Sequence, residues 1–196
     1  MLPRRQLWKA RPANPARDRE EPRKAAVQGT CGSPDVLEVG QVGKPVAGDD
    51  DLLVRVHAAG VDPGVWHLMT GLPYLVRVMG YGLRTPQVRV RGRDVAGRVE
   101  AVGTNVTGFH LGDEVFGIGG GSFAGYVCAR PGKLVAKPAN LTFEQAAAVP
   151  ISGLTALQAL RDGGQVQPGQ RVLIIGAAGG VGSFACSWPG RSARTR

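Results

Sequence analysis

The chain has 196 residues, of which 43% are hydrophobic and 20% charged, with a formal net charge of +9. This is enough for one hydrophobic core, or for one domain and part of another. No apolar run approaches the length of a bilayer span, and the N-terminus lacks the apolar stretch of a secretory signal. The three cysteines are scattered and predict neither a disulfide framework nor a metal site. We therefore expect a cytoplasmic protein without membrane partners.

The excess positive charge lies at the two ends of the chain. Residues 1–24 carry eight Lys or Arg against three Asp or Glu, and residues 186–196 add three arginines and no acid. The part between them is almost neutral, with thirteen basic and twelve acidic residues. Both ends contain prolines and lack hydrophobic periodicity, so we expect a disordered basic arm over 1–24 and no specific nucleic-acid partner.

Short strands punctuated by glycine and proline are predicted from residue 25 to residue 138. In DLLVRVHAAGV, residues 51–61, small apolar side chains alternate with Arg55 and His57, which places these two on the polar face. Similar runs follow over 87–103, 112–119 and 123–138. Strands this short and this rich in glycine favour a closed or partly closed antiparallel barrel, and His57 is expected to be a surface histidine.

The periodicity changes at Thr142, where helices replace strands. Thr142 and Gln145 have capping-box spacing and precede a helix that reaches Pro150. A second helix is predicted over SGLTALQALRDGG, residues 152–164. The run RVLIIG, residues 171–176, is typical of a strand buried in a parallel sheet. The chain therefore enters an α/β domain near its end.

The glycine-rich stretch AAGGVG, residues 177–182, joins this predicted strand to a further helix start. Such glycines let backbone N–H groups approach a pyrophosphate, whose charge is favoured at a helix N-terminus. Ala177 occupies the first glycine position of the G-x-G-x-x-G pattern, and the other two positions match. We predict a phosphate-binding loop, with a glycine-rich packing turn as the alternative. The residues assigned to the cofactor here are Gly176, Gly179, Gly180, Val181 and Gly182.

Five segments, taken in order, resemble the medium-chain dehydrogenase/reductase superfamily in its zinc-independent, quinone oxidoreductase-like and alcohol dehydrogenase-like branch. They are AAGVDPGVWHLMTG, GRDVAGRVEAVG, LGDEVFG, AAAVPISGLTAL and VLIIGAAGGVG. The resemblance implies a mainly β GroES-like catalytic domain over 25–150. A linking helix and the first strand, loop and helix of an NAD(P)-binding Rossmann domain would follow over 151–185. It also implies an oxidoreductase that uses NADP, with NAD left open, and an intact parent that can form a homodimer.

The resemblance also bears on metal binding and on the reaction. Zinc-dependent relatives have a Cys where this chain has Asp62, and a His-Glu pair where it has Arg93 and Asp94. A guanidinium has no lone pair to offer a metal, so no zinc is expected. The implied reaction is hydride transfer to a small-molecule substrate: a quinone, an enone or a similar carbonyl compound. The chain also departs from the family at Gly125, where relatives usually have Glu or another polar residue.

Three further side chains are candidates for the site. Asp62 stands where quinone reductases usually carry an Asn facing the nicotinamide ribose, and Thr155 matches a Thr that approaches the nicotinamide. His67 aligns with a histidine that relays a proton in alcohol dehydrogenases. His67 and Asp62 are assigned as catalytic, and Thr155 is assigned to the cofactor. Each has a structural alternative: Asp62 organising a turn, Thr155 bonding within its helix, and His67 packing against its neighbour. The alternative functions are a zinc-independent alcohol dehydrogenase with His67 as its relay, and a noncatalytic GroES-like fragment.

The last eleven residues, CSWPGRSARTR, do not continue the helix that the loop begins, because Pro189 and Gly190 break it. Written with suitable codons and shifted by one restored base, they read VQLARALGAHA, an amphipathic helix with the Gln that the family pattern requires. Tryptophan has a single codon, so the shifted Trp-Pro junction must read Ala. We therefore expect a one-base deletion after Ala185 and an off-frame tail over 186–196. The truncated chain is expected to be inactive, with the apolar run at 172–175 exposed or folded back on the barrel.

Overall fold

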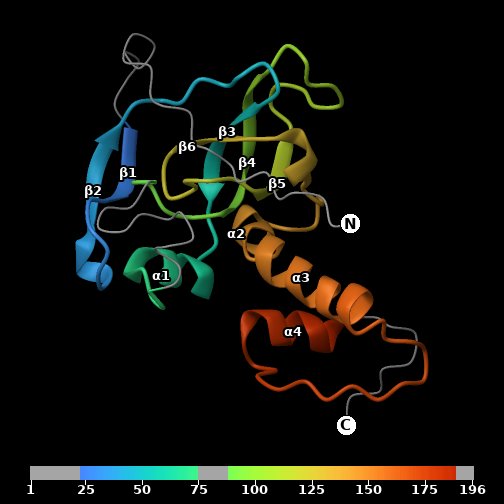
Figure 1. Cartoon of the computed structure of the whole chain (residues 1–196). Helices are drawn as coiled ribbons and strands as arrows, with labels where there is room; N and C mark the ends of the chain where they lie inside the picture. The colour runs from blue at the N-terminus through green and yellow to red at the C-terminus, as the bar shows by residue number, and fades with distance from the viewer. Residues whose placement is uncertain (1–22, 75–87, 189–196) are drawn as a thin grey trace, which may run out of the picture.

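The computed structural model describes residues 23–74 and 88–188, so most of the predicted basic arm and of the predicted off-frame tail lie outside the described residues. Two antiparallel sheets form the larger part of the fold (Figure 1). The smaller sheet pairs β1 (Arg23–Gln28) with β2 (Leu37–Val42), and a 3-10 turn at Pro34–Val36 precedes β2. β1 already begins at Arg23, inside the stretch predicted as the arm.

The larger sheet has five strands in the order β6-β3-β4-β5-β7, and every neighbouring pair is antiparallel. The strands are β3 (Leu52–Ala58), β4 (Asp94–Val102), β5 (Glu114–Ile118), β6 (Tyr126–Ala129) and β7 (Leu134–Ala136). A 3-10 turn at Pro131–Lys133 joins the last two. Buried side chains from all five strands meet in one core, so the sheet curves around it as the predicted barrel requires. They are Leu52, Val54, Val95, Val99, Val115, Val127, Ala129 and Leu134.

The alternation predicted for β3 is confirmed. Val54 is buried, whereas Arg55 and His57 are exposed. His57 stacks on the ring of Phe143, with ring centroids 4.3 Å apart. On the neighbouring strand β4, a Cβ atom at Gly97 would collide with the backbone carbonyl of Arg55, so the close approach of these two strands requires glycine there.

One helix was not predicted from the sequence: α1 (Pro63–Thr70), which comes after β3. The helix predicted after Thr142 is formed as α2 (Phe143–Ala147), which comes after β7. The predicted capping box is confirmed: the backbone N–H of Gln145 donates to Thr142 Oγ1 at 3.2 Å, and the N–H of Thr142 donates to Gln145 Oε1 at 3.0 Å. α2 buries two alanines against Ala96 of β4, which fixes this helix on the sheet.

The second predicted helix is also confirmed. α3 (Pro150–Leu157) continues as a π-helical segment, Gln158–Gly163, and ends at the predicted glycines. α4 (Gly180–Ser187) packs beside α3 (Figure 1). α4 ends at Ser187, and the extended backbone of Trp188 is what the following proline favours. This limits α4 to about two turns, as predicted.

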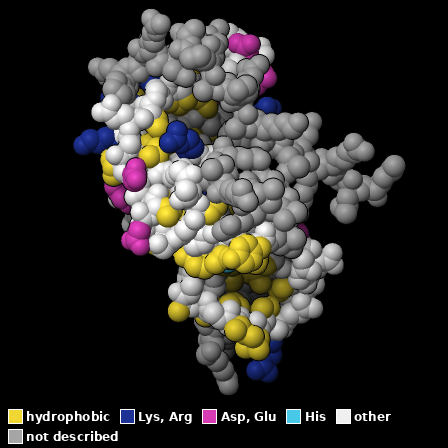
Figure 2. Space-filling view, turned by 60° about the vertical axis from the view of Figure 1, so that its left-hand side comes forward, with side chains coloured by type: hydrophobic (Ala, Val, Ile, Leu, Met, Phe, Trp, Pro, Cys, Tyr) yellow, Lys and Arg dark blue, Asp and Glu magenta, His cyan; other side chains and the backbone are white. Residues whose placement is uncertain are grey.

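One predicted element is not formed. The run at 171–176 has no strand structure and belongs to neither sheet of the described residues. Leu173 is 87% exposed and Ile175 is 90% exposed, so the predicted exposure of this apolar run is confirmed. Hydrophobic side chains gather on the lower part of the molecule in Figure 2, where α3 and α4 lie in Figure 1. Among the described helices, none is long and apolar enough to cross a membrane.

Candidate functional site

Asp62 stands at the start of α1 and caps it. Its Oδ1 accepts a hydrogen bond from the backbone N–H of Gly64 at 2.7 Å, and Pro63 supplies the fixed φ that suits the first helical position. Asp62 is only 7% exposed, and its Oδ2 is buried without a hydrogen-bond partner among the described residues. One carboxylate oxygen therefore organises the turn, while the other is an acceptor that still lacks a donor.

His67 lies near the end of α1 and is exposed. Its Nδ1 is 2.9 Å from the carbonyl oxygen of Leu72, and its ring meets that of Trp66 edge-on with centroids 5.0 Å apart. A carbonyl oxygen can only accept, so Nδ1 carries the proton in this bond. In the neutral ring, Nε2 is then left as an acceptor, which is the protonation pattern that a proton relay uses.

Asp94 is a site residue that the sequence prediction missed. It opens β4, is 3% exposed, and its Oδ1 accepts a hydrogen bond from the backbone N–H of Ile151 at 3.0 Å. Burial raises the pKa of Asp94 to about 6, and the nearby Asp62 charge raises it further. The hydrogen bond from Ile151 and the positive charge of Arg93 both act to lower this pKa. The motif GRDVAGRVEAVG contained this aspartate, but its burial depends on contacts with residues far away in the chain.

Arg93 is the third charged residue near Asp62 and Asp94. A Cβ atom placed at Gly64 would lie 2.6 Å from Asp62 Oδ1 and 3.4 Å from Arg93 Nη1, so the carboxylate and the guanidinium both flank Gly64. The structure thus brings Asp62, Arg93 and Asp94 together at the junction of α1, β4 and α3. Two carboxylates beside a guanidinium are a poor donor set for zinc. Within residues 23–74 and 88–188 no group of three or more His, Cys, Asp or Glu could hold a metal ion.

Thr155 lies one turn along α3 and is exposed. Its hydroxyl donates to the carbonyl oxygen of Ile151 at 2.7 Å. Thr155 therefore makes the bond within its own helix that was considered as its structural role. The hydroxyl oxygen keeps lone pairs for a donor from a ligand. Thr155 is therefore held in place from the same turn of α3 that Asp94 contacts.

The glycine loop forms a tight turn in front of α4. Gly176 has a φ of 77°, which favours glycine, and its carbonyl oxygen accepts from the N–H of Gly179 at 3.0 Å. A Cβ at Gly182 would collide with the Gly176 carbonyl, and a Cβ at Gly180 would lie 2.7 Å from Ser152 Oγ on α3. Val181 is half-exposed. The loop has the close backbone approach of a phosphate-binding turn, although the strand expected before it is missing.

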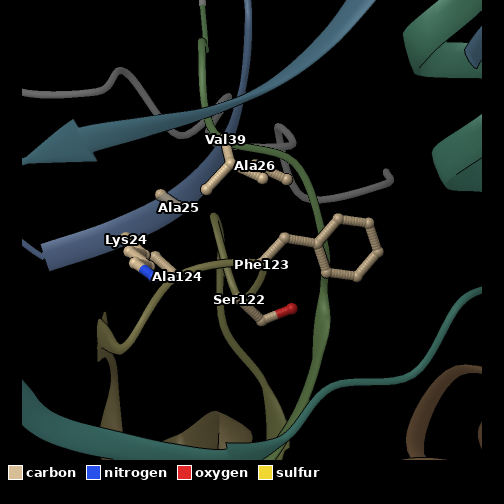
Figure 3. Close-up of a pocket in the computed structure, with 7 residues that line it drawn as sticks. All are labelled: Lys24, Ala25, Ala26, Val39, Ser122, Phe123 and Ala124. Carbon is tan, nitrogen blue, oxygen red and sulfur yellow. The ribbon is translucent and has the colours of Figure 1, made fainter. Parts of the chain in front are cut away.

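A separate shallow pocket of about 280 Å³ lies beside the small β1–β2 sheet (Figure 3). It is lined by residues of β1 and β2 and of the segment before β6, namely Lys24, Ala25, Ala26, Val39, Ser122, Phe123 and Ala124. None of the predicted site residues lines it. The candidate site is therefore the junction of α1, β4 and α3 rather than this pocket.

Comparison with known proteins identifies a domain family and several relatives that resemble this chain. Residues 48–139 match the alcohol dehydrogenase GroES-like domain. The chain is 39% identical over 158 residues to a quinone oxidoreductase of Sus scrofa, an alignment that covers 79% of this chain and 46% of the relative. The chain spans about half the length of the curated relatives it matches.

Solved structures give the same result. The quinone oxidoreductase of Coxiella burnetii has a TM-score of 0.76 and 33% identity, covering 85% of this chain and 52% of that one. The mycobacterial protein Rv1454c, solved in complex with NADPH, has a TM-score of 0.73 and 29% identity, covering 85% of this chain and 49% of that one. This chain therefore carries an alcohol dehydrogenase GroES-like domain and is a homologue of the quinone oxidoreductases, in agreement with the resemblance found in its sequence.

Proposed function

We propose that the intact parent of this chain is an NAD(P)H-dependent, zinc-independent oxidoreductase that reduces a quinone, an enone or a similar carbonyl compound. The glycine loop in front of α4 carries the proposal, because its backbone is folded so tightly that Gly182 has no room for a side chain. The likeness to quinone oxidoreductases and to an NADPH-bound structure supports it. NADP is preferred to NAD on that likeness alone.

When bound, the nicotinamide would supply the hydride. The loop Gly176–Gly182 would hold the pyrophosphate through its N–H groups, and Thr155 would approach the nicotinamide. Asp62 would use its unpartnered Oδ2 to accept a hydrogen bond from a hydroxyl group, because a buried acceptor without a donor is costly. In this proposal the residues bind and orient, and the substrate is activated by its own electronics.

The geometry of His67 supports a second candidate, a zinc-independent alcohol dehydrogenase. Its Nδ1 is held by Leu72 and its ring is exposed, so Nε2 is placed to pass a proton to solvent. The third candidate is a noncatalytic GroES-like fragment. We keep a cytoplasmic location in the proposal because Cys31, Cys128 and Cys186 are free. A homodimeric parent is part of the proposal by resemblance.

The experiment uses protein expressed from a gene whose reading frame is restored after the codon for Ala185. NADPH and NADH oxidation are measured with quinones and with enones, with and without a chelator, beside NADP reduction with alcohols. Chelator-resistant reduction of quinones or enones supports the proposal. Alcohol oxidation that is lost in His67→Asn supports the second candidate, and no turnover of any substrate supports the third. Activity that disappears with the chelator would contradict the zinc-free mechanism.

A further inference from the structure

Helix α3 has no cap of its own. Val149, the residue before its first turn, is apolar and makes no side-chain capping bond, and Pro150 has no N–H. Ile151 is therefore the first residue of α3 with an N–H to satisfy, and first-turn N–H groups have no partner within a helix. In this structure the partner comes from the sheet: Asp94 Oδ1 accepts from Ile151 across 57 positions of sequence.

Asp94 is enclosed by several segments that meet at this point. A Cβ atom at Gly60, in the connection between β3 and α1, would lie 2.5 Å from the carbonyl oxygen of Ala147 and 2.9 Å from Asp94 Cβ. The end of α2 and the side chain of Asp94 thus both press on that connection. The carboxylate has little freedom to move, so it can fix what it binds.

α3 in turn carries the parts assigned to the cofactor. Thr155 lies one turn after Ile151 and bonds to its carbonyl. Ser152 lies against Gly180 of the glycine loop, and Phe184 of α4 lies near Gly153. A continuous series of contacts therefore runs from β4, through Asp94 and α3, to α4.

The charge on Asp94 is costly. The side chain is 3% exposed, and the neighbouring Asp62 carboxylate adds repulsion that Arg93 only partly offsets. A buried apolar or neutral residue would avoid this cost, so packing alone does not account for a carboxylate here. A carboxylate does offer a strong acceptor for an N–H at a helix N-terminus, where negative charge is favourable.

We propose that Asp94 is a positioning residue that ties α3 to the barrel and thereby sets where Thr155 stands relative to Asp62. The inference rests on the proposed function only in assuming that Thr155 approaches the nicotinamide. It extends that function by naming Asp94 as the residue that connects the substrate side of the site with the cofactor side. Asp94 acts through α3 and does not itself touch the reacting atoms.

The four isoleucines of the chain make a direct test possible. Ile151 reports on the start of α3, Ile118 pairs with Asp94 in the sheet, and Ile174 and Ile175 belong to the run without strand structure. The 196-residue chain, labelled with ¹⁵N-isoleucine, gives four amide signals whose hydrogen exchange is followed by NMR. No cofactor is added, so failure of the proposed function would leave this result unaffected.

In the wild-type chain, Ile151 must exchange much more slowly than Ile174 and Ile175. In Asp94→Ala, exchange at Ile151 is expected to accelerate roughly 10- to 100-fold, the loss expected for a hydrogen bond to a charged group. Ile118 should keep its rate. Asp94→Asn keeps an acceptor oxygen and should restore most of the protection at Ile151. The matched control is Asp113→Ala, which removes a half-exposed aspartate that accepts from the backbone N–H of His110 and should leave the exchange rate of Ile151 unchanged.

Two outcomes would overturn the proposal. Equal acceleration of Ile118 and Ile151 in Asp94→Ala would show a general loss of stability instead of a loss of positioning. Exchange of Ile151 as fast as that of Ile174 and Ile175 in the wild-type chain would show that the bond does not hold α3. The second measurement needs no variant, so it decides the matter even where Asp94→Ala does not fold.

Discussion

Replacing Asp94 by Asn should make the chain more stable at neutral pH, and the gain should disappear in acid. The reason is the burial of the carboxylate, which raises the pKa of Asp94 from its ordinary 3.8 to about 6. Between these two pH values the folded chain binds more protons than the unfolded chain. The free energy of unfolding therefore falls as the pH rises through this window, and the whole penalty is present above about pH 6.

The size of the effect follows from the two pKa values. The difference between 3.8 and about 6 corresponds to about 3 kcal/mol of stability that the ionised form lacks. An asparagine removes the charge and keeps an oxygen for the N–H of Ile151. The buried N–H₂ group of the asparagine needs an acceptor, and burying it without one costs about 1 kcal/mol or more of the stability gained by removing the charge. We expect a net gain of roughly 1–2 kcal/mol at pH 7.5.

Urea unfolding followed by far-UV circular dichroism from pH 4 to pH 8 measures this difference. Asp35→Asn serves as the control, since it removes one negative charge from an exposed position. The Asp94 variant should be the more stable at pH 7.5, with the gap closing towards pH 4, while the control shows no such trend. A variant less stable than wild type at pH 7.5, or a gap that does not change with pH, would refute the reasoning.

Four further outcomes are expected. Gly97→Ala should destabilise the chain by about 2–4 kcal/mol in urea unfolding, because the added Cβ collides with the Arg55 carbonyl. Gly125→Ala is the matched case: the nearest atom to its Cβ would be 3.9 Å away, so a change between 0 and about 1 kcal/mol in favour of the fold is expected. Leu173→Lys and Ile175→Lys should reduce aggregation in light scattering without lowering the unfolding midpoint, because both side chains are exposed. Titration of the 196-residue chain with NADPH, followed by nicotinamide fluorescence, should show no saturable binding at micromolar concentrations, because the run before the glycine loop forms no strand. Saturation in that range would show that the loop binds the cofactor without this strand.

Local patterns predicted much of this fold. The capping box at Thr142, the alternation along β3 and the end of the second helix at its glycines each depend on residues a few positions apart. Such signals act within one element and survive whatever surrounds it. The exposure of His57 was predicted in the same way, from its place on the polar face of a single strand.

The burial of Asp94 and the state of the 171–176 run could not be predicted from local patterns. Asp94 is buried because α2 and α3, about fifty positions later in the chain, cover the start of β4. The apolar run has the composition of a parallel strand, but a strand exists only where a neighbour accepts and donates its hydrogen bonds. Within the described residues no strand lies beside it, so the same composition gives an exposed segment.

The candidate side chains also show why the structural and functional interpretations need not exclude each other. Asp62 uses one oxygen to cap α1 and leaves the other unpartnered among the described residues. His67 uses Nδ1 to bind Leu72, which leaves Nε2 as the acceptor in the neutral ring, and Thr155 donates within α3 while its oxygen can still accept. In each case the structural bond fixes the side chain and so orients the remaining atom. Because an atom held in one direction loses less entropy when a ligand binds, these local bonds would favour ligand binding at the proposed site.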